Sequence, residues 1–102
     1  DERVVDYIVE IVHATRNPDQ AGLAELKPLI EFGASPRATL ALAQGSRAHA
    51  FLRGRAFVTP DDVKAIAPDV LRHRVLRTYE AEAEEVTSDE IVARILEAIP
   101  VP

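Results

Sequence analysis

The sequence contains no cysteine, no methionine and no tryptophan, and its aromatic residues are limited to two tyrosines and three phenylalanines. Without cysteine the chain can form neither disulfides nor thiolate metal sites, which fits a reducing compartment and predicts a cytoplasmic location. With so few aromatic residues, the core must consist of Leu, Ile, Val and Ala, which suit close packing between helices. No apolar run approaches the roughly 18 residues of a transmembrane helix, and the start shows no signal-peptide pattern.

Acidic residues outnumber basic ones. The 102 residues carry a formal net charge of −5, and the isoelectric point is near 5.1. Non-specific nucleic-acid binders need a basic face that displaces counterions from phosphates, so this balance predicts no nucleic-acid partner. The length fits one domain over residues 1–102. Because the chain opens on Asp1, directly before a helical pattern and without an initiating methionine, we expect it to be part of a longer protein.

Apolar residues recur at helical spacing near the start of the chain and predict a helix that Asp1 caps and that Asn17-Pro18 ends. Residues 18–34 show no sustained period. They predict one helical turn near residues 23–27 and a short extended piece at residues 29–32. The predicted buried face of the first helix consists of Val4, Val5, Ile8, Ile11 and Val12.

A second long helix is predicted from Pro36 to about Arg53. Ser35 is its predicted N-cap, because its hydroxyl can accept a hydrogen bond from a free N–H group of the first turn, and Pro36 suits the first helical position. Gly54 is the glycine that commonly follows a helix end. Residues 55–58 then predict a short strand.

Two further helix starts share the same local chemistry. A threonine N-cap follows a valine and precedes acidic residues of the first turn, at Thr59 and again at Thr87. Pro68 is predicted to break the helix that begins after Thr59, because proline lacks an N–H group and its ring clashes with the preceding turn. Another turn is predicted at residues 70–75.

The charged residues 77–85 are predicted to be extended or loop, and the last helix is predicted to span Ser88–Ala98. The whole chain therefore predicts a mainly α fold. Its architecture would be a small bundle of four helices, one of them broken, with one or two short strands.

The segment Gly33-Ala34-Ser35-Pro36-Arg37-Ala38 indicates a chemical role. The helices after Thr59 and Thr87 carry acids at their second and third positions, whereas this helix carries Arg37 and Ala38 there. An exposed cation beside the positive end of a helix dipole is unfavourable by roughly a few tenths of a kcal/mol. A bound anion, phosphate above all, would satisfy both the guanidinium and the free N–H groups of the helix. The alternative is a solvated arginine on an ordinary Ser-Pro helix start.

Read with its neighbours, this segment resembles the helical lid of MoxR-type AAA+ ATPases. The similarity extends over nearly the whole chain, and its motifs occur in the same order as in that family. The matching segments are Tyr7-Ile8-Val9 with Ala14-Thr15-Arg16, Gly33-Ala34-Ser35-Pro36-Arg37-Ala38, Phe57-Val58-Thr59-Pro60-Asp61-Asp62-Val63, Val70-Leu71-Arg72-His73-Arg74-Val75 and the ending Ile99-Pro100-Val101-Pro102.

The resemblance implies a C-terminal lid that closes over ATP and Mg²⁺ held by a separate α/β core. Arg37 would be the sensor-2 arginine that contacts the γ-phosphate, with Ser35 and Pro36 beside it in the nucleotide site. Tyr7 and Ile8 would lie near the adenine, with burial in the domain core as their alternative. The chain has no phosphate loop and no strand ending in paired acids, so we expect the fragment alone to bind no cofactor and to catalyse nothing, although the full-length protein would hydrolyse ATP. The histidines are too scattered to predict a metal site.

The resemblance also implies partners. These are the AAA+ core of the same protein, further copies in a homo-oligomeric ring (a hexamer), and a protein with a von Willebrand factor A domain, in a chaperone-like remodelling or metal-insertion role. Two other hypotheses remain open. One is a helix-turn-helix-like DNA-binding domain, in which Arg72, His73, Arg74 and Arg77 face phosphates. The other is a plain helical protein-interaction module.

Overall fold

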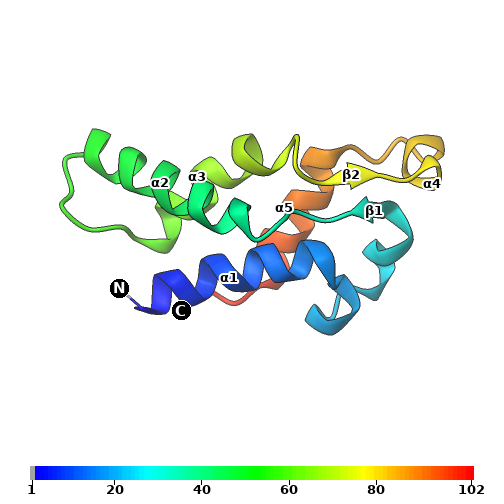
Figure 1. Ribbon diagram of the computed structural model, residues 1–102, viewed down its shortest axis with the longest axis horizontal. Coiled ribbons are helices and arrows are strands. Elements are labelled where there is room, and N and C mark those ends of the chain that lie inside the picture. The colour runs from blue at the N-terminus through cyan, green and yellow to red at the C-terminus, as the bar shows by residue number, and fades with distance from the viewer. Residues whose placement is uncertain (1) are drawn as a thin grey trace.

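The computed structural model describes residues 2–102, so the predicted Asp1 cap lies outside the described residues. The chain forms an elongated domain with principal extents of 43 × 22 × 21 Å (Figure 1). Four helices make its body, and a two-stranded ribbon with a short helix makes one end. The mainly α fold predicted from the sequence is confirmed. The body helices are α1 (Glu2–Arg16), α2 (Arg37–Leu52), α3 (Pro60–Leu71) and α5 (Ser88–Ala98).

Helix α1 ends at Arg16, as the Asn17-Pro18 pair predicts. Its buried face differs from the prediction, because Val5 is exposed, whereas Tyr7, Ala14 and Thr15 are also buried. A face that includes the tyrosine ring removes more apolar surface from water than one that includes a valine. The apolar spacing therefore located the helix correctly, but it predicted a buried face that is rotated towards Val5 and away from Tyr7.

The irregular segment after α1 contains two short 3₁₀ helices, η1 (Pro18–Ala21) and η2 (Ala24–Leu29), and then strand β1 (Ile30–Phe32). The helical turn and the extended piece predicted here are confirmed. Strand β1 pairs in antiparallel register with β2 (Leu76–Arg77), so that Ile30 lies opposite Arg77. Only a structure reveals this pairing, because the two strands are far apart in the sequence.

The strand predicted at residues 55–58 is wrong. These residues form bends in the connection between α2 and α3, at the opposite end of the domain from the ribbon (Figure 1). A strand needs a partner edge, and β1 pairs with β2 instead. The glycine prediction just before this connection is confirmed, since Gly54 follows α2 with a φ of 75°, a left-handed conformation that glycine adopts without steric cost.

Helix α2 begins one residue later than predicted, and Ser35 is not its N-cap. Pro36 occupies that position with helical dihedral angles (φ −56°, ψ −23°), and the helix has no side-chain cap. Ser35 contributes its backbone carbonyl, which accepts a hydrogen bond from the N–H of Ala38 at 2.9 Å. The N-cap is therefore Pro36, one residue after the predicted N-cap Ser35.

Helix α3 begins as predicted, after Thr59, but Pro68 does not break it. The helix continues through the proline to Leu71. Ala67 and Leu71, on either side of Pro68, are both fully buried in the core. Packing of this face stabilises the helix enough to tolerate one missing hydrogen bond, because tertiary burial outweighs local propensity. The further turn predicted at residues 70–75 is present only as the end of α3 and the turn at residues 72–74 that follows it.

Residues 77–85 contain a helix that the sequence pattern did not predict. After β2, Thr78 caps the short helix α4 (Tyr79–Ala83) by accepting a hydrogen bond from the N–H of Ala81. These charged residues were predicted to be extended or loop. Arg77 is extended as part of β2, whereas Ala81 is fully buried and fixes the helix against the domain. Helix α5 has the predicted bounds and buries Ile91 and Ile95 completely.

The cap of α5 gives a direct test of this local chemistry. The Thr87 hydroxyl oxygen accepts a hydrogen bond from the N–H of Glu90 at 3.1 Å. We expect Thr87→Ala to lower the free energy of unfolding by about 1 kcal/mol, the usual effect of losing an N-cap. Urea denaturation followed by circular dichroism measures this, with Thr87→Ser as the control that keeps the hydroxyl. If the alanine and serine variants are equally stable, the cap contributes nothing.

Candidate functional site

The structure places Ser35, Pro36 and Arg37 together at the start of α2. Arg37 is the first helical residue and is exposed, and no acid lies in the first turn. Within residues 2–102 its guanidinium has no ion pair or hydrogen bond. The N–H groups of Ala38 and Thr39 donate to the carbonyls of Ser35 and Pro36. The guanidinium is therefore the principal donor that this helix start offers to an anion.

The turn before Arg37 is fixed to the end of α1 by a buried threonine. The Thr15 hydroxyl donates to the carbonyl of Val12 at 2.6 Å and accepts from the N–H of Ala34 at 2.9 Å. Thr15 and Ala34 are both fully buried. Gly33 passes so close to α1 that a Cβ atom there would lie 2.2 Å from the carbonyl oxygen of Thr15. The start of α2 is thus held at a defined position relative to α1.

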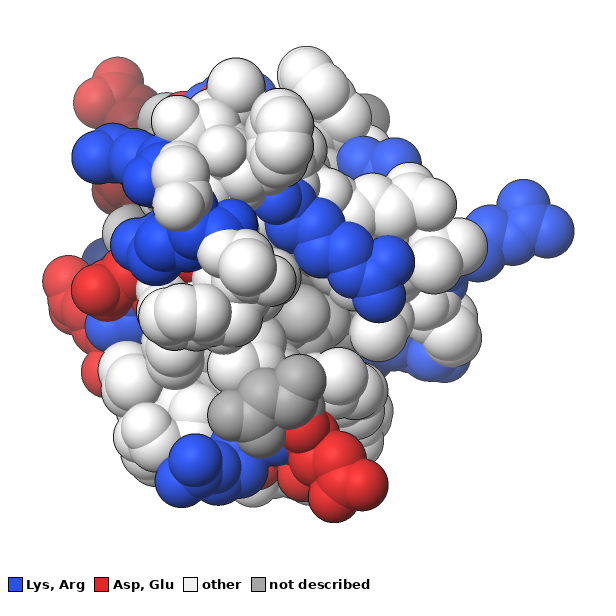
Figure 2. Space-filling view, turned by 90° about the vertical axis from the view of Figure 1, so that its left-hand side faces the viewer, with Lys and Arg blue, Asp and Glu red and all other residues white. Residues whose placement is uncertain are grey.

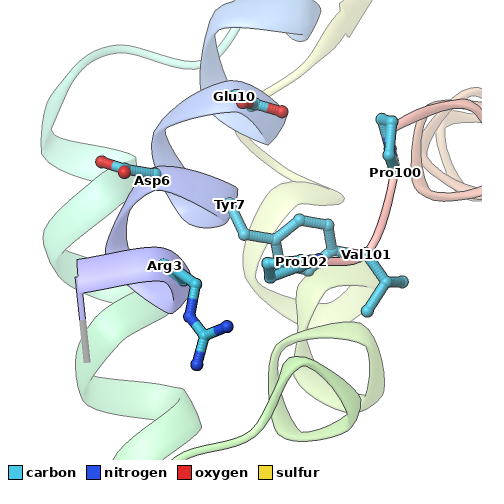
Figure 3. A pocket seen from close by; sticks show the side chains of 7 residues that line it. All are labelled: Arg3, Asp6, Tyr7, Glu10, Pro100, Val101 and Pro102. Atoms are coloured by element: carbon cyan, nitrogen blue, oxygen red, sulfur yellow. The ribbon is translucent and has the colours of Figure 1, made fainter.

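Tyr7 and Ile8 lie in the domain core, which is the alternative that the sequence left open for them. Tyr7 also borders a hollow of about 310 Å³, formed where Pro100, Val101 and Pro102 lie along α1 (Figure 3). Burial, and next the nearby carboxylate of Asp61, raise the pKa of the Tyr7 hydroxyl above its ordinary value. This side chain is eight residues before Thr15 on α1, or about 12 Å along the helix axis, so it is well separated from the Thr15 contacts to the turn before Arg37.

A buried charge cluster between α2 and α3 was not predicted. The Asp62 carboxylate is fully buried and lies 2.6 Å from His49 Nδ1, and it also pairs with the guanidinium of Arg55. It accepts further hydrogen bonds from the backbone N–H and the hydroxyl of Thr59, at 2.8 and 3.1 Å. The signal in the sequence was the acid three residues after the Thr59 cap, but that position alone does not reveal its partners, His49 on α2 and Arg55 in the connection that follows.

These contacts determine the charge of Asp62. Burial by itself would raise the pKa of this carboxyl, but the hydrogen bonds from Thr59 and His49 and the charge of Arg55 outweigh burial and lower the pKa from 3.8 to about 2. Asp62 therefore stays ionised at neutral pH. Both carboxylate oxygens of Asp62 are occupied by intramolecular contacts, whereas the buried Nε of Arg55 has no hydrogen-bond partner within the described residues. These contacts join α2, the following connection and α3.

Under the helix-turn-helix hypothesis, Arg72, Arg74 and Arg77 would contact DNA phosphates. In the structure these arginines instead contact groups of the domain itself. Arg72 pairs with Asp69 and Asp89. Arg74 donates to a backbone carbonyl of α3, and Arg77 to the carbonyl of Val86. In the part of the chain that the structure describes, no three His, Asp or Glu side chains come together to hold a metal ion.

Comparison with known proteins identifies the class of this domain. Residues 24–95 match the family model described as the AAA lid domain. The matched region includes the start of α2 with Arg37, and it covers well over half of the chain. The chain therefore belongs to the AAA lid domain family.

The individual relatives specify the type of lid. The chain is 44% identical over 99 residues to Chaperone MoxR1 of Mycobacterium tuberculosis, covering 97% of this chain and 26% of that protein. It is 31% identical over 102 residues to Protein MoxR of Methylorubrum extorquens, covering 94% of this chain and 29% of that protein. These names confirm the predicted resemblance to the MoxR family.

A solved structure agrees with this assignment. The crystal structure of a candidate ATPase from Cytophaga hutchinsonii has a TM-score of 0.96 to this chain at 39% identity, covering all of this chain and 31% of that one. The chain thus spans between a quarter and a third of the length of these three proteins. Across residues 2–102, no helix combines the length and apolar character that a membrane crossing requires.

Proposed function

We propose that this lid senses nucleotide, closing over ATP that a separate α/β core holds, and that Arg37 is the sensor-2 arginine. The observation that carries the proposal is the unpaired guanidinium of Arg37 at an acid-free helix start within the matched family region. A phosphate is the ligand that this arrangement suits, because a planar guanidinium can donate two parallel hydrogen bonds to phosphate oxygens.

The contribution of the chain to ATP hydrolysis would be electrostatic. A cation aimed at the γ-phosphate stabilises the negative charge of the transferring group in the transition state. Thr15 and Gly33 would keep the turn before Arg37 at one position, so that the guanidinium approaches the nucleotide whenever the lid closes. Ser35 and Pro36 shape the same turn. The phosphate loop and the Mg²⁺ ligands would belong to the core, so the chain alone is proposed to be inactive.

For Tyr7 and Ile8, an adenine contact remains a proposal. Ile8 lies within the core, whereas Tyr7 has one edge on the hollow beside Pro100–Pro102 (Figure 3). Although Tyr7 is only 2% exposed, its ring borders this open hollow, and the edge of an aromatic ring suits contact with a purine. Of these two residues, we therefore assign the adenine contact to Tyr7.

The test is ATP turnover in the full-length protein. We expect Arg37→Ala to lower kcat by about a hundredfold, the scale on which single charge-stabilising donors act. Arg37→Lys keeps the charge but not the planar fork, so it should restore only part of the rate. Arg94→Ala, on α5, removes an exposed arginine that also has no partner within residues 2–102 and is the matched control. Equal turnover in the Arg37→Ala and Arg94→Ala variants would refute the sensor role.

The wider setting is also proposed on the family resemblance. The full-length protein would form a homo-oligomeric ring of six subunits in the cytoplasm. It would work as a chaperone-like remodeller or metal-insertion factor, with a von Willebrand factor A-domain protein as partner. The name Chaperone MoxR1 of the mycobacterial relative supports this remodelling role. Analytical ultracentrifugation of the full-length protein with ATP tests the ring, which a monomer under all nucleotide conditions would contradict.

A further inference from the structure

The distribution of charge along the chain is strongly uneven. Although the chain has 17 acidic residues and a net charge of −5, none of these acids lies within residues 32–60. That segment contains α2 and its connection to α3, and it carries four arginines. An acid-free stretch of this length in an acidic domain gives α2 a basic surface.

The same segment leaves large apolar side chains in water. Leu40, Phe51, Leu52 and Phe57 are exposed to 61, 78, 82 and 65%. Single exposed apolar residues are ordinary, but a group of them rimmed by polar residues marks an interaction surface. Aromatic residues and arginine are also the types enriched in protein interfaces.

Helical geometry places these features on one side of α2. At 100° per residue, the exposed residues Leu40, Gln44, Arg47 and Phe51 fall within about 80° of Arg37 around the axis. Together these five residues form a strip about 21 Å long, which we call the α2 strip. Leu52 lies at the same end of α2 as Phe51, about 100° further round the axis, and Phe57 lies in the connection that follows.

Figure 2 views the domain from this far end. In the upper part, where α2 and its connection to α3 lie, Lys and Arg side chains stand among uncharged residues, and acidic side chains keep to the left edge and the bottom. A partner for this surface must therefore be acidic and apolar at once. Opposite charges would guide the contact and the apolar side chains would hold it.

We propose that the α2 strip docks on an acidic, apolar surface of the nucleotide-holding core, with Arg37 at the phosphates and Phe51 and Leu52 as the distal anchor. The inference rests on the proposed function, because it extends the contact of Arg37 along the helix that carries it. Since α2 is rigid and is joined to α3 through Asp62, an anchor about 21 Å along the helix from Arg37 would fix the angle at which Arg37 enters the site.

Photo-crosslinking in the full-length protein tests the occupant of the strip. Phe51 is replaced by a photo-reactive phenylalanine analogue, and the crosslinked peptides are identified by mass spectrometry without nucleotide and with a non-hydrolysable ATP analogue. We expect crosslinks to peptides of the core that contain acids, more abundant with the analogue. The matched control carries the same substitution at Tyr79, which is 91% exposed at the opposite end of the domain and should give no such crosslinks.

Other occupants give different results. Crosslinks from Phe51 to the acidic helix α4 of another copy would show that a second lid covers the strip, and an absence of crosslinks would show that the strip is solvated; either result overturns the proposal. The double variant Phe51→Ser with Leu52→Ser should reduce kcat/KM for ATP about tenfold in the full-length protein, while leaving the melting temperature of the 102-residue chain unchanged.

Failure of the two proposals can be distinguished. If Arg37→Ala leaves turnover intact while Phe51 still crosslinks to the core, the sensor role is lost and the docking surface remains. If Arg37→Ala abolishes turnover while Phe51 contacts no core peptide, the sensor role remains and the docking surface is withdrawn.

Discussion

Replacing Gly33 with alanine is expected to destabilise the domain by about 3 kcal/mol, the upper part of the range for overpacking a close contact. The added Cβ atom would lie 2.2 Å from the carbonyl oxygen of Thr15, 2.5 Å from its carbonyl carbon and 2.7 Å from Cα of Arg16. All three are backbone atoms of α1, which cannot rotate aside as a side chain can. The turn before Arg37 would have to move away from α1 and lose the hydrogen bond from Ala34 to Thr15.

Chemical denaturation of the isolated chain measures this change. The control is Gly45→Ala in the middle of α2, where the nearest atom to the new Cβ is Cδ1 of the Ile66 side chain at 3.2 Å. The higher helix propensity of alanine, about 1 kcal/mol, offsets that milder contact, so the control should be near neutral. A Gly33→Ala variant as stable as the Gly45→Ala variant would show that the turn does not pack against α1 in this way.

The second large effect is expected at Asp62. Replacing it with asparagine should cost about 3–5 kcal/mol, as when one member of a buried ion pair is removed. The variant removes the negative charge that pairs with Arg55 and His49. Its amide N–H₂ also replaces one of the two carboxylate oxygens and therefore faces groups that donate hydrogen bonds. Asp61→Asn is the matched control, because Asp61 is adjacent but exposed, and its loss should cost less than about 1 kcal/mol. The midpoints of urea denaturation measure the stability of the two variants. Equal midpoints for Asp62→Asn and Asp61→Asn would contradict the larger cost expected at Asp62.

The same residue predicts a pH dependence. The pKa of Asp62 is about 2 in the folded domain and ordinarily 3.8, so the unfolded chain takes up the proton more readily. Its contribution to stability is therefore fully present above about pH 4 and is lost as the pH falls from there towards 2. Thermal unfolding from pH 5 to pH 2 should show a steeper decline for the wild type than for Asp62→Asn. Parallel curves would mean that another carboxyl governs the acid transition.

Features encoded by neighbouring residues could be predicted from the sequence. Thr59 and Thr87 start their helices as expected, and Asn17-Pro18 ends α1, because caps and prolines act within one turn. Pro68 shows the limit of this reasoning. Its local preference is to break a helix, but the fully buried residues beside it determine the outcome.

Contacts between distant segments could not be predicted. Nothing near residue 30 specifies residue 77 as its pairing partner, so the second strand was placed at residues 55–58 instead. For the candidate site, the sequence predicted a role for Arg37 from its unusual position at a helix start, and this role stays a prediction. It did not reveal Thr15, whose hydroxyl holds the turn before Arg37, because a threonine inside a helix has no distinctive pattern until its partner is known.

Two connections within the domain, the α2–α3 hairpin and the β1–β2 ribbon, lead us to expect a particular order of folding. Helices α2 and α3 are neighbours in the chain, and Asp62 links them across a short connection, so this hairpin closes at little entropic cost. The β1–β2 ribbon joins residues 30 and 77, so its closure costs more loop entropy and we expect it to form after the hairpin. A partly unfolded domain would therefore keep the hairpin and open first at the ribbon. Amide hydrogen exchange should be slowest in α2 and α3 and fastest around residues 30 and 77.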